Sequence, residues 1–141
     1  MLKIIITSFL GAYFSAVLFQ TPRKSAVAAS VIASFGYTVY WGLFGPLPEL
    51  YACYIGTLCI VMLCEVLARR IKTPTTTMLF PALIPLVPGV GLYKMMYGMA
   101  TGDSAMAYET GINALMIAGC MALSVDSGRM IMVLYDKIRH L

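Results

Sequence analysis

The chain has 141 residues, of which 60% are hydrophobic and 11% are charged. Soluble domains carry about 25% charged residues, so this composition is typical of an integral membrane protein and argues against a soluble enzyme or a nucleic-acid-binding domain. The formal net charge of +4 comes from Lys and Arg residues between apolar segments, which indicates membrane topology rather than a polyanion-binding surface.

Five segments approach the roughly 20 apolar residues that a membrane-spanning helix needs. They predict an all-α membrane protein with a single domain over residues 1–141. The first segment starts close to Lys3 but is followed by no small-residue cleavage site, so we expect a retained helix rather than a signal peptide. The predicted spans cover residues 2–20, 25–44, 47–68, 75–97 and 108–134.

The links between these segments alternate in charge. Lys and Arg occupy the links at 21–24 and 68–72 and the C-terminal tail, whereas the links at 45–50 and 98–109 contain acidic residues and no Lys or Arg. Because cytoplasmic loops are enriched in Lys and Arg, we expect the N-terminus outside and the C-terminus in the cytoplasm. Five crossings satisfy every link, so a spanning fourth segment is favoured over a re-entrant one.

Small residues recur every four positions on two of the segments. In lipid, such faces let helix backbones approach closely. The sequence leaves open whether they pack within the chain or against another subunit. They are Ala26, Ser30 and Ser34 in the second segment and Ala114, Ala118 and Ala122 in the fifth.

The fourth segment contains FPALIPLVPGVGLYK, in which three prolines and two glycines interrupt an apolar run. Pro81, Pro85 and Pro88 would share one helical face. Each removes an amide donor and costs about 3 kcal/mol in a helix interior. We therefore predict a half-helix, an unwound stretch near residues 85–89, and a second half-helix that begins at Gly89 or Val90.

A helix broken at membrane depth is tolerated where its backbone is buried or lines a cavity. The carbonyls of Thr77, Pro81 and Ile84 would lose their amide partners and could accept from an ammonium group or a cation. The amides that begin the second half-helix would favour a carboxylate. This pattern predicts a site for a zwitterion, the alternative being a kinked helix that only shapes the bundle. The predicted substrate-binding residues are Pro81, Pro85, Pro88, Gly89, Val90, Gly91 and Thr77.

A few polar side chains lie in or near the spans. Asn113 falls inside the fifth segment, and Asp126 and Arg129 lie near its cytoplasmic end. Intramembrane ionisable groups are candidates for function. Asp126 with Arg129, and Glu65 with Arg69, can also form local ion pairs across one helical turn, and we favour these pairs over a proton relay.

No catalytic motif, metal-binding cluster or cofactor motif is present in the sequence. The four cysteines form no CxxC pair and are expected to be buried apolar groups. The single histidine, His140, lies in the charged tail and is given no role.

The runs ARRIKTP (68–74) and FPALIPLVPGVGLYKMM (80–96) resemble the C-terminal membrane half of the threonine/serine exporter family. Small stand-alone members of that family work with a separately encoded larger membrane subunit. The resemblance implies a multi-pass protein of the bacterial inner membrane that exports threonine, serine or related small carboxylates, driven by a proton gradient. It implies the larger subunit as a partner, leaves a higher oligomer open, and implies no enzyme activity.

Two other functions fit the same features. A structural or assembly subunit would use the broken helix only to dock a neighbour, and a passive channel would conduct a small solute without coupling to protons. Transport assays distinguish all three.

Overall fold

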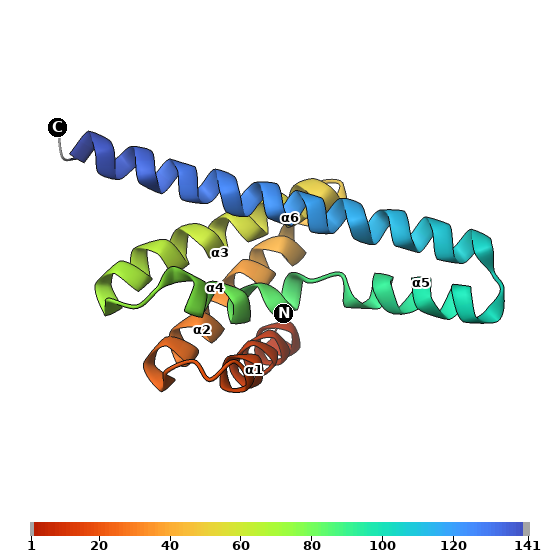
Figure 1. The fold of residues 1–141 in the computed structure, drawn as a ribbon, viewed down its shortest axis with the longest axis horizontal. Helices are drawn as coiled ribbons and strands as arrows, with labels where there is room; N and C mark the ends of the chain where they lie inside the picture. Colours follow the sequence, from red (N-terminus) through yellow and green to blue (C-terminus); the bar gives the residue numbers. More distant parts are fainter. Residues whose placement is uncertain (1, 140–141) are drawn as a thin grey trace.

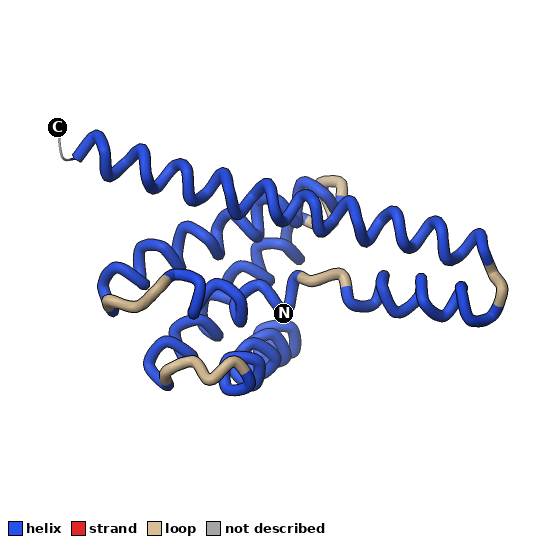
Figure 2. Tube along the Cα trace, in the orientation of Figure 1, coloured by secondary structure: helices blue, strands red, loops and turns tan. Residues whose placement is uncertain are grey.

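A computed structural model describes residues 2–139, so the expectation for His140 lies outside the described residues. This part of the chain is helical apart from short links, as predicted (Figure 2). The elements are α1 (Leu2–Leu18), α2 (Arg23–Leu43), α3 (Glu49–Ile71), α4 (Thr75–Leu83), the 3₁₀ helix η1 (Ile84–Leu86), α5 (Gly89–Thr101) and α6 (Ser104–Arg139).

Local sequence explains where the helices begin. Pro22, Pro48 and Pro74 stand immediately before α2, α3 and α4 with extended backbone angles. Proline suits this place because the first amides of a helix have no intrahelical acceptor. Before α6, the carboxylate of Asp103 accepts a hydrogen bond of 3.0 Å from the amide of Met106, which caps the helix start.

Within residues 2–139, three helices, α2, α3 and α6, are long and apolar enough to cross a membrane. The bent pair of α4 with η1 and α5 would make a fourth span, and its two parts meet at an angle of 59°. Helix α1 is apolar but has only 17 residues. The count of five spans and the predicted orientation therefore stay predictions.

The fourth and fifth segments extend further than their hydropathy suggested. Helix α5 continues to Thr101, and α6 has 36 residues instead of the predicted 108–134. At 1.5 Å per residue, α6 is about 54 Å long. It is longer than the roughly 30 Å hydrocarbon core of a bilayer, so it must tilt or extend beyond the core.

Helices α3 and α6 run in the same direction. The thiol of Cys120 donates to the carbonyl of Leu50 at 3.2 Å near the start of α3, and Arg69 contacts Asp136 near its end. The basic link at 68–72 and the basic tail therefore lie at the same end of the bundle. This arrangement agrees with the alternating crossings that the charge pattern predicted.

Helix α2 lies at the centre of the bundle, between α1, α3 and α4 (Figure 1). Its small-residue face, which includes Ala26, Ser30 and Ser34, is buried. Close approach to α3 depends on Gly36, because a Cβ there would lie 2.2 Å from Cγ1 of Ile60. The small face of α2 therefore packs within the chain.

The small face of α6 is divided. Ala114 is buried, whereas Ala118 and Ala122 are exposed. Within residues 2–139, this exposed part of the face has no helix packed on it, so a contact with another subunit remains open there.

Helix α5 and residues 104–117 of α6 form a hairpin, which we call the arm. Figure 1 shows the arm projecting beyond α1–α4. In the described part of the chain, α6 is the only helix with which α5 makes extensive contact. Gly98 allows the two helices to lie close together, because a Cβ there would lie 2.8 Å from the amide nitrogen of Ala107.

Candidate functional site

The chain breaks between α4 and α5 as the prolines predicted. After η1, Val87 is extended, and Pro88 has φ −75° and ψ 57°. These angles describe an inverse γ-turn, closed by a 2.7 Å hydrogen bond from the amide of Gly89 to the carbonyl of Val87. The predicted break and the restart at Gly89 are confirmed, but the unwound part is limited to Val87 and Pro88, because Pro85 and Leu86 lie in η1.

Two carbonyls that were expected to lose their partners have found others. The carbonyl of Thr77 accepts from the hydroxyl of Thr21 at 3.3 Å, and the carbonyl of Ile84 accepts from the amide of Val87 at 3.1 Å. The prediction that these carbonyls are free for an ammonium group or cation is therefore wrong. A buried hydroxyl from the link before α2 and a 3₁₀ hydrogen bond replace the missing helical amides.

The amides at the start of α5 are only partly free. Gly89 uses its amide in the γ-turn, and Leu92 donates to the carbonyl of Pro88 at 3.1 Å as the first hydrogen bond of α5. Between them, the amides of Val90 and Gly91 have no acceptor in the described chain. The predicted anion-binding amides are thus reduced to these two, and Gly89 is not one of them.

A cavity of about 410 Å³ lies beside the break, at the base of the arm. From the predicted site it takes in Pro85, Pro88, Val90, Gly91 and Asn113. Helices α2, α3, α5 and α6 complete its wall. Its polar side chains are those of Tyr37, Tyr40, Glu49, Lys94, Thr110 and Asn113.

The cavity contains two opposite charges that are not paired. The half-buried carboxylate of Glu49 accepts a 3.4 Å hydrogen bond from the hydroxyl of Tyr40. Lys94 stands one turn after Val90 on α5. Among the described residues, neither Glu49 nor Lys94 forms an ion pair. The cavity therefore presents an acceptor for a cation and a donor for an anion at the same time.

Thr77 and Pro81 lie outside this cavity. They line a smaller one of about 240 Å³, together with Phe19, Thr21 and Phe80. Gly89 lines neither cavity, and a Cβ at Gly89 would have no atom within 4 Å. The predicted site is therefore divided into two places.

Sequence reasoning missed five of the six polar residues of the larger cavity, including Thr110. Tyr37 and Tyr40 had the pattern of an interfacial aromatic belt, Glu49 that of a polar turn, and Lys94 that of a side chain reaching for water. The sequence placed these residues near the outer ends of neighbouring segments. It did not predict which of the helices are in contact there.

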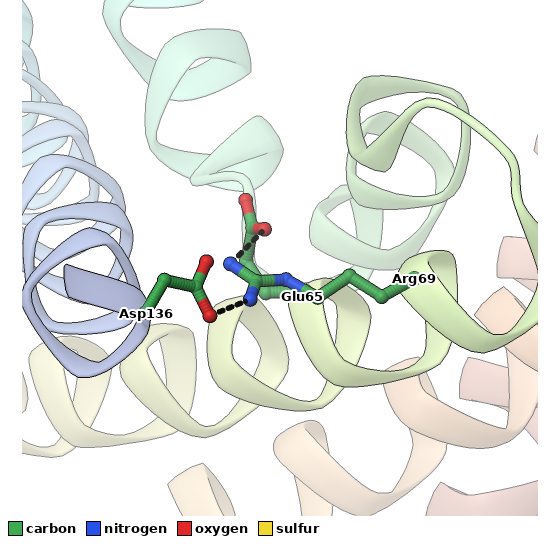
Figure 3. Close-up of polar contacts among 3 residues, drawn as sticks. All are labelled: Glu65, Arg69 and Asp136. Atoms are coloured by element: carbon green, nitrogen blue, oxygen red, sulfur yellow. Dashed lines mark hydrogen bonds and ion pairs between the residues drawn. The ribbon is translucent and has the colours of Figure 1, made fainter. Parts of the chain in front are cut away.

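The predicted ion pairs have different outcomes. Arg69 lies 3.9 Å from Glu65, as expected, and it also binds Asp136 on α6 (Figure 3). Asp126 and Arg129 form no ion pair within residues 2–139, so that prediction is wrong. Asp126 is exposed, and an exposed pair gains little against the entropy of ordering two side chains.

No metal site is formed by the described residues, in which no three His, Cys, Asp or Glu side chains come together suitably. The four cysteines are free thiols. Cys53 and Cys64 are buried, whereas Cys59 and Cys120 are partly buried.

A groove of about 500 Å³ between α1 and α2 is larger than the cavity at the break. Its two hydroxyls are already used: Ser34 donates to the carbonyl of Ile5 at 3.3 Å, and Thr38 donates to the carbonyl of Ser34 at 2.7 Å. The rest of its lining is apolar, so this groove suits lipid chains rather than a polar solute.

Comparison with known proteins gives one finding. The family model described as Threonine/Serine exporter, ThrE, matches residues 4–130. No curated protein and no solved structure matches the chain.

Proposed function

The chain belongs to the threonine/serine exporter family, and from this premise we propose that it is the small subunit of a two-component secondary exporter. The family makes it a membrane transport subunit rather than an enzyme. The proposal adds that it crosses the bacterial inner membrane several times, exports threonine, serine or a related small carboxylate, and is driven by the proton gradient.

The observation that carries the proposal is the cavity at the break, with its unpaired Glu49 and Lys94. An amino acid is a zwitterion, and it needs partners of both signs within a short distance. A volume of about 410 Å³ falls within the range of small-molecule sites. The cavity is therefore large enough for a small amino acid and offers partners for both of its charges.

Each part of an amino acid has a partner in the cavity. The carboxylate is bound by Lys94 and by the free amides of Val90 and Gly91, at the positive end of α5. The ammonium group is bound by Glu49, which Tyr40 holds in place. A hydroxyl on the substrate side chain is hydrogen-bonded by Asn113, whose amide group can both donate and accept a hydrogen bond.

The exposure of the same cavity is an argument for a second subunit in the exporter. Lys94 and Asn113 are exposed, and α5 is covered on one side by α6 alone. Irregular backbone at membrane depth must be enclosed by protein or line a water-filled cavity. A larger membrane subunit placed against the arm would close the site around its solute.

Glu65 and Asp126 are not part of the proposed proton-coupling machinery. Glu65 is engaged by Arg69, and Asp126 is exposed away from the cavity, so neither is assigned a coupling role. In a two-component exporter these groups can lie on the larger subunit.

Efflux of labelled threonine from preloaded cells tests the proposal. We expect deletion of this chain or of the larger subunit to abolish export equally, and a proton uncoupler to stop export at a fixed solute gradient. Export by either subunit alone would refute the two-component arrangement. Unchanged flux with uncoupler would indicate a passive channel, and Glu49→Gln or Lys94→Met without effect on export per assembled complex would indicate an assembly subunit.

A further inference from the structure

A groove of about 460 Å³ lies between α3 and α6, at the end of the bundle where the basic links gather. We propose that it binds one phospholipid whose headgroup carries both a phosphate and a primary ammonium group, as phosphoethanolamine does. This site is distinct from the cavity at the break, and its argument does not depend on the transport function.

The groove is amphipathic along its length. One part is lined by the apolar side chains of Met62, Val66, Ile131 and Met132. The other part is lined by Arg69, Arg70, Tyr135 and Asp136. An acyl chain fits the first part and a polar headgroup the second, in the order in which a lipid meets the membrane interface. Basic pockets between membrane helices are known places for lipid headgroups.

The two arginines have different partners. Arg69 lies between Glu65 and Asp136, and its charge is therefore already offset (Figure 3). Arg70 is exposed and forms no ion pair with any described residue. Its guanidinium group can bind phosphate through two parallel hydrogen bonds. Arg70 is thus the phosphate-binding group of the proposed site.

The charge balance decides which kind of phospholipid fits. The charged residues that line the groove are Arg69, Arg70 and Asp136, and Glu65 contacts Arg69 from outside the lining, so the formal charge of these four residues sums to zero. An anionic lipid would leave a surplus negative charge next to Asp136, whose side chain is 40% exposed. An ammonium group beside the phosphate removes that surplus by donating to the same carboxylate. Choline carries the same positive charge but has no N–H donor, so it balances the charge without forming a hydrogen bond to Asp136.

The test is lipid binding to the purified full chain, measured by native mass spectrometry. The probes are phosphatidylethanolamine, phosphatidylglycerol and phosphatidylcholine with identical acyl chains, together with free phosphoethanolamine. Because one charge-assisted hydrogen bond is worth about tenfold in affinity, we expect phosphatidylethanolamine to bind about tenfold more tightly than the other two lipids. Free phosphoethanolamine should bind far more weakly, since it has no acyl chain.

Three variants and a matched control make the test specific. Arg70→Gln should weaken the binding of phosphatidylethanolamine about tenfold. Arg23→Gln changes an exposed arginine of another basic link and should leave this binding unchanged. Asp136→Asn should reverse the preference in favour of phosphatidylglycerol, because it releases Arg69. Val66→Trp should weaken the binding of phosphatidylethanolamine and of phosphatidylglycerol, because the larger side chain fills the apolar part of the groove.

Equal binding of the three lipids, or equal effects of Arg70→Gln and Arg23→Gln, would overturn the proposal. Equal affinity for free phosphoethanolamine would show a site for soluble phosphate compounds instead of a lipid.

Discussion

The hydroxyl of Thr21 lies 3.3 Å from the carbonyl of Thr77 and donates to it, in place of the amide that Pro81 lacks. This contact joins residues 56 positions apart. It explains how α4 stays helical through Pro81, which lies inside it. The half-helix before the break is therefore held by the link between α1 and α2.

Replacing Thr21 by valine should destabilise the protein. The change keeps the volume of the side chain but leaves the carbonyl of Thr77 without a donor, at a cost of about 1 kcal/mol. Thermal unfolding in detergent measures it. Thr21→Ser, which keeps the hydroxyl, should unfold close to the natural protein. A larger loss of stability for Thr21→Ser than for Thr21→Val would show that the methyl group, and not the hydrogen bond, matters.

Alanine at Gly91 and at Gly89 should have different effects on transport. A Cβ on Gly91 would lie 3.3 Å from Cβ of Ala114, which would push α5 away from α6 beside the cavity. A Cβ on Gly89 would meet no atom within 4 Å. We expect Gly91→Ala to reduce export several-fold and Gly89→Ala to leave it nearly unchanged, in cells with equal amounts of protein in the membrane. A larger loss at Gly89 would mean that this residue contacts a solute or a partner.

Glu49→Gln should weaken binding only of solutes that carry an ammonium group. Loss of one charged hydrogen bond predicts about a tenfold rise in the concentration of threonine needed for half-maximal transport. A hydroxy acid of the same size without the amino group should be unaffected. Competition against labelled threonine in membrane vesicles measures both.

Lys94→Met is the matched control for Glu49→Gln, because Lys94 is assigned to the carboxylate that both solutes share. Lys94→Met should weaken the binding of threonine and of the hydroxy acid to a similar degree. If Glu49→Gln also weakens both solutes equally, Glu49 acts on the shape of the site and not on the ammonium group.

Gly36→Ala should destabilise the bundle by about 1–3 kcal/mol, the usual cost of an overpacked core. A Cβ at Gly36 would lie 2.2 Å from Cγ1 of the fully buried Ile60. Gly42, on the same helix, has no atom within 4 Å of such a Cβ, so Gly42→Ala should have little effect. Thermal unfolding in detergent compares the two, and a second change, Ile60→Ala, should relieve the clash at Gly36. An equal loss at Gly42 would show that the clash with Ile60 is not the cause, because alanine has a higher helix propensity than glycine at both positions.

The sequence predicted features that depend on local chemistry. Proline removes an amide wherever it stands, so Pro85 and Pro88 located the break within a residue or two. Alternating basic links predicted which helix ends lie together, and the contact between Arg69 and Asp136 agrees with this. The small-residue face of α2 was recognised, but its intramolecular packing appeared only in the structure.

Features that depend on distant residues could not be predicted in the same way. No pattern in the chain shows that Thr21 reaches Thr77, or that Tyr40 reaches Glu49 across the turn between α2 and α3. The carbonyls freed by proline were therefore assigned to a ligand, although those of Thr77 and Ile84 already have partners in the protein. The acidic side of the cavity was missed for the same reason, because Glu49 gains its role from the helices around it.

The parallel pairing of α3 with α6 also sets the order in which the bundle can be completed. The hydroxyl of Ser124 donates to the carbonyl of Tyr54 at 2.9 Å, across 70 residues of intervening chain. At about 5–20 residues per second, the ribosome adds that length in roughly 4–14 s. During this interval the face of α3 that Ser124 and Gly128 later cover has no contact with α6, because that part of α6 has not yet been made. Membrane insertion of the first helices and completion of the fold are therefore separate events in time.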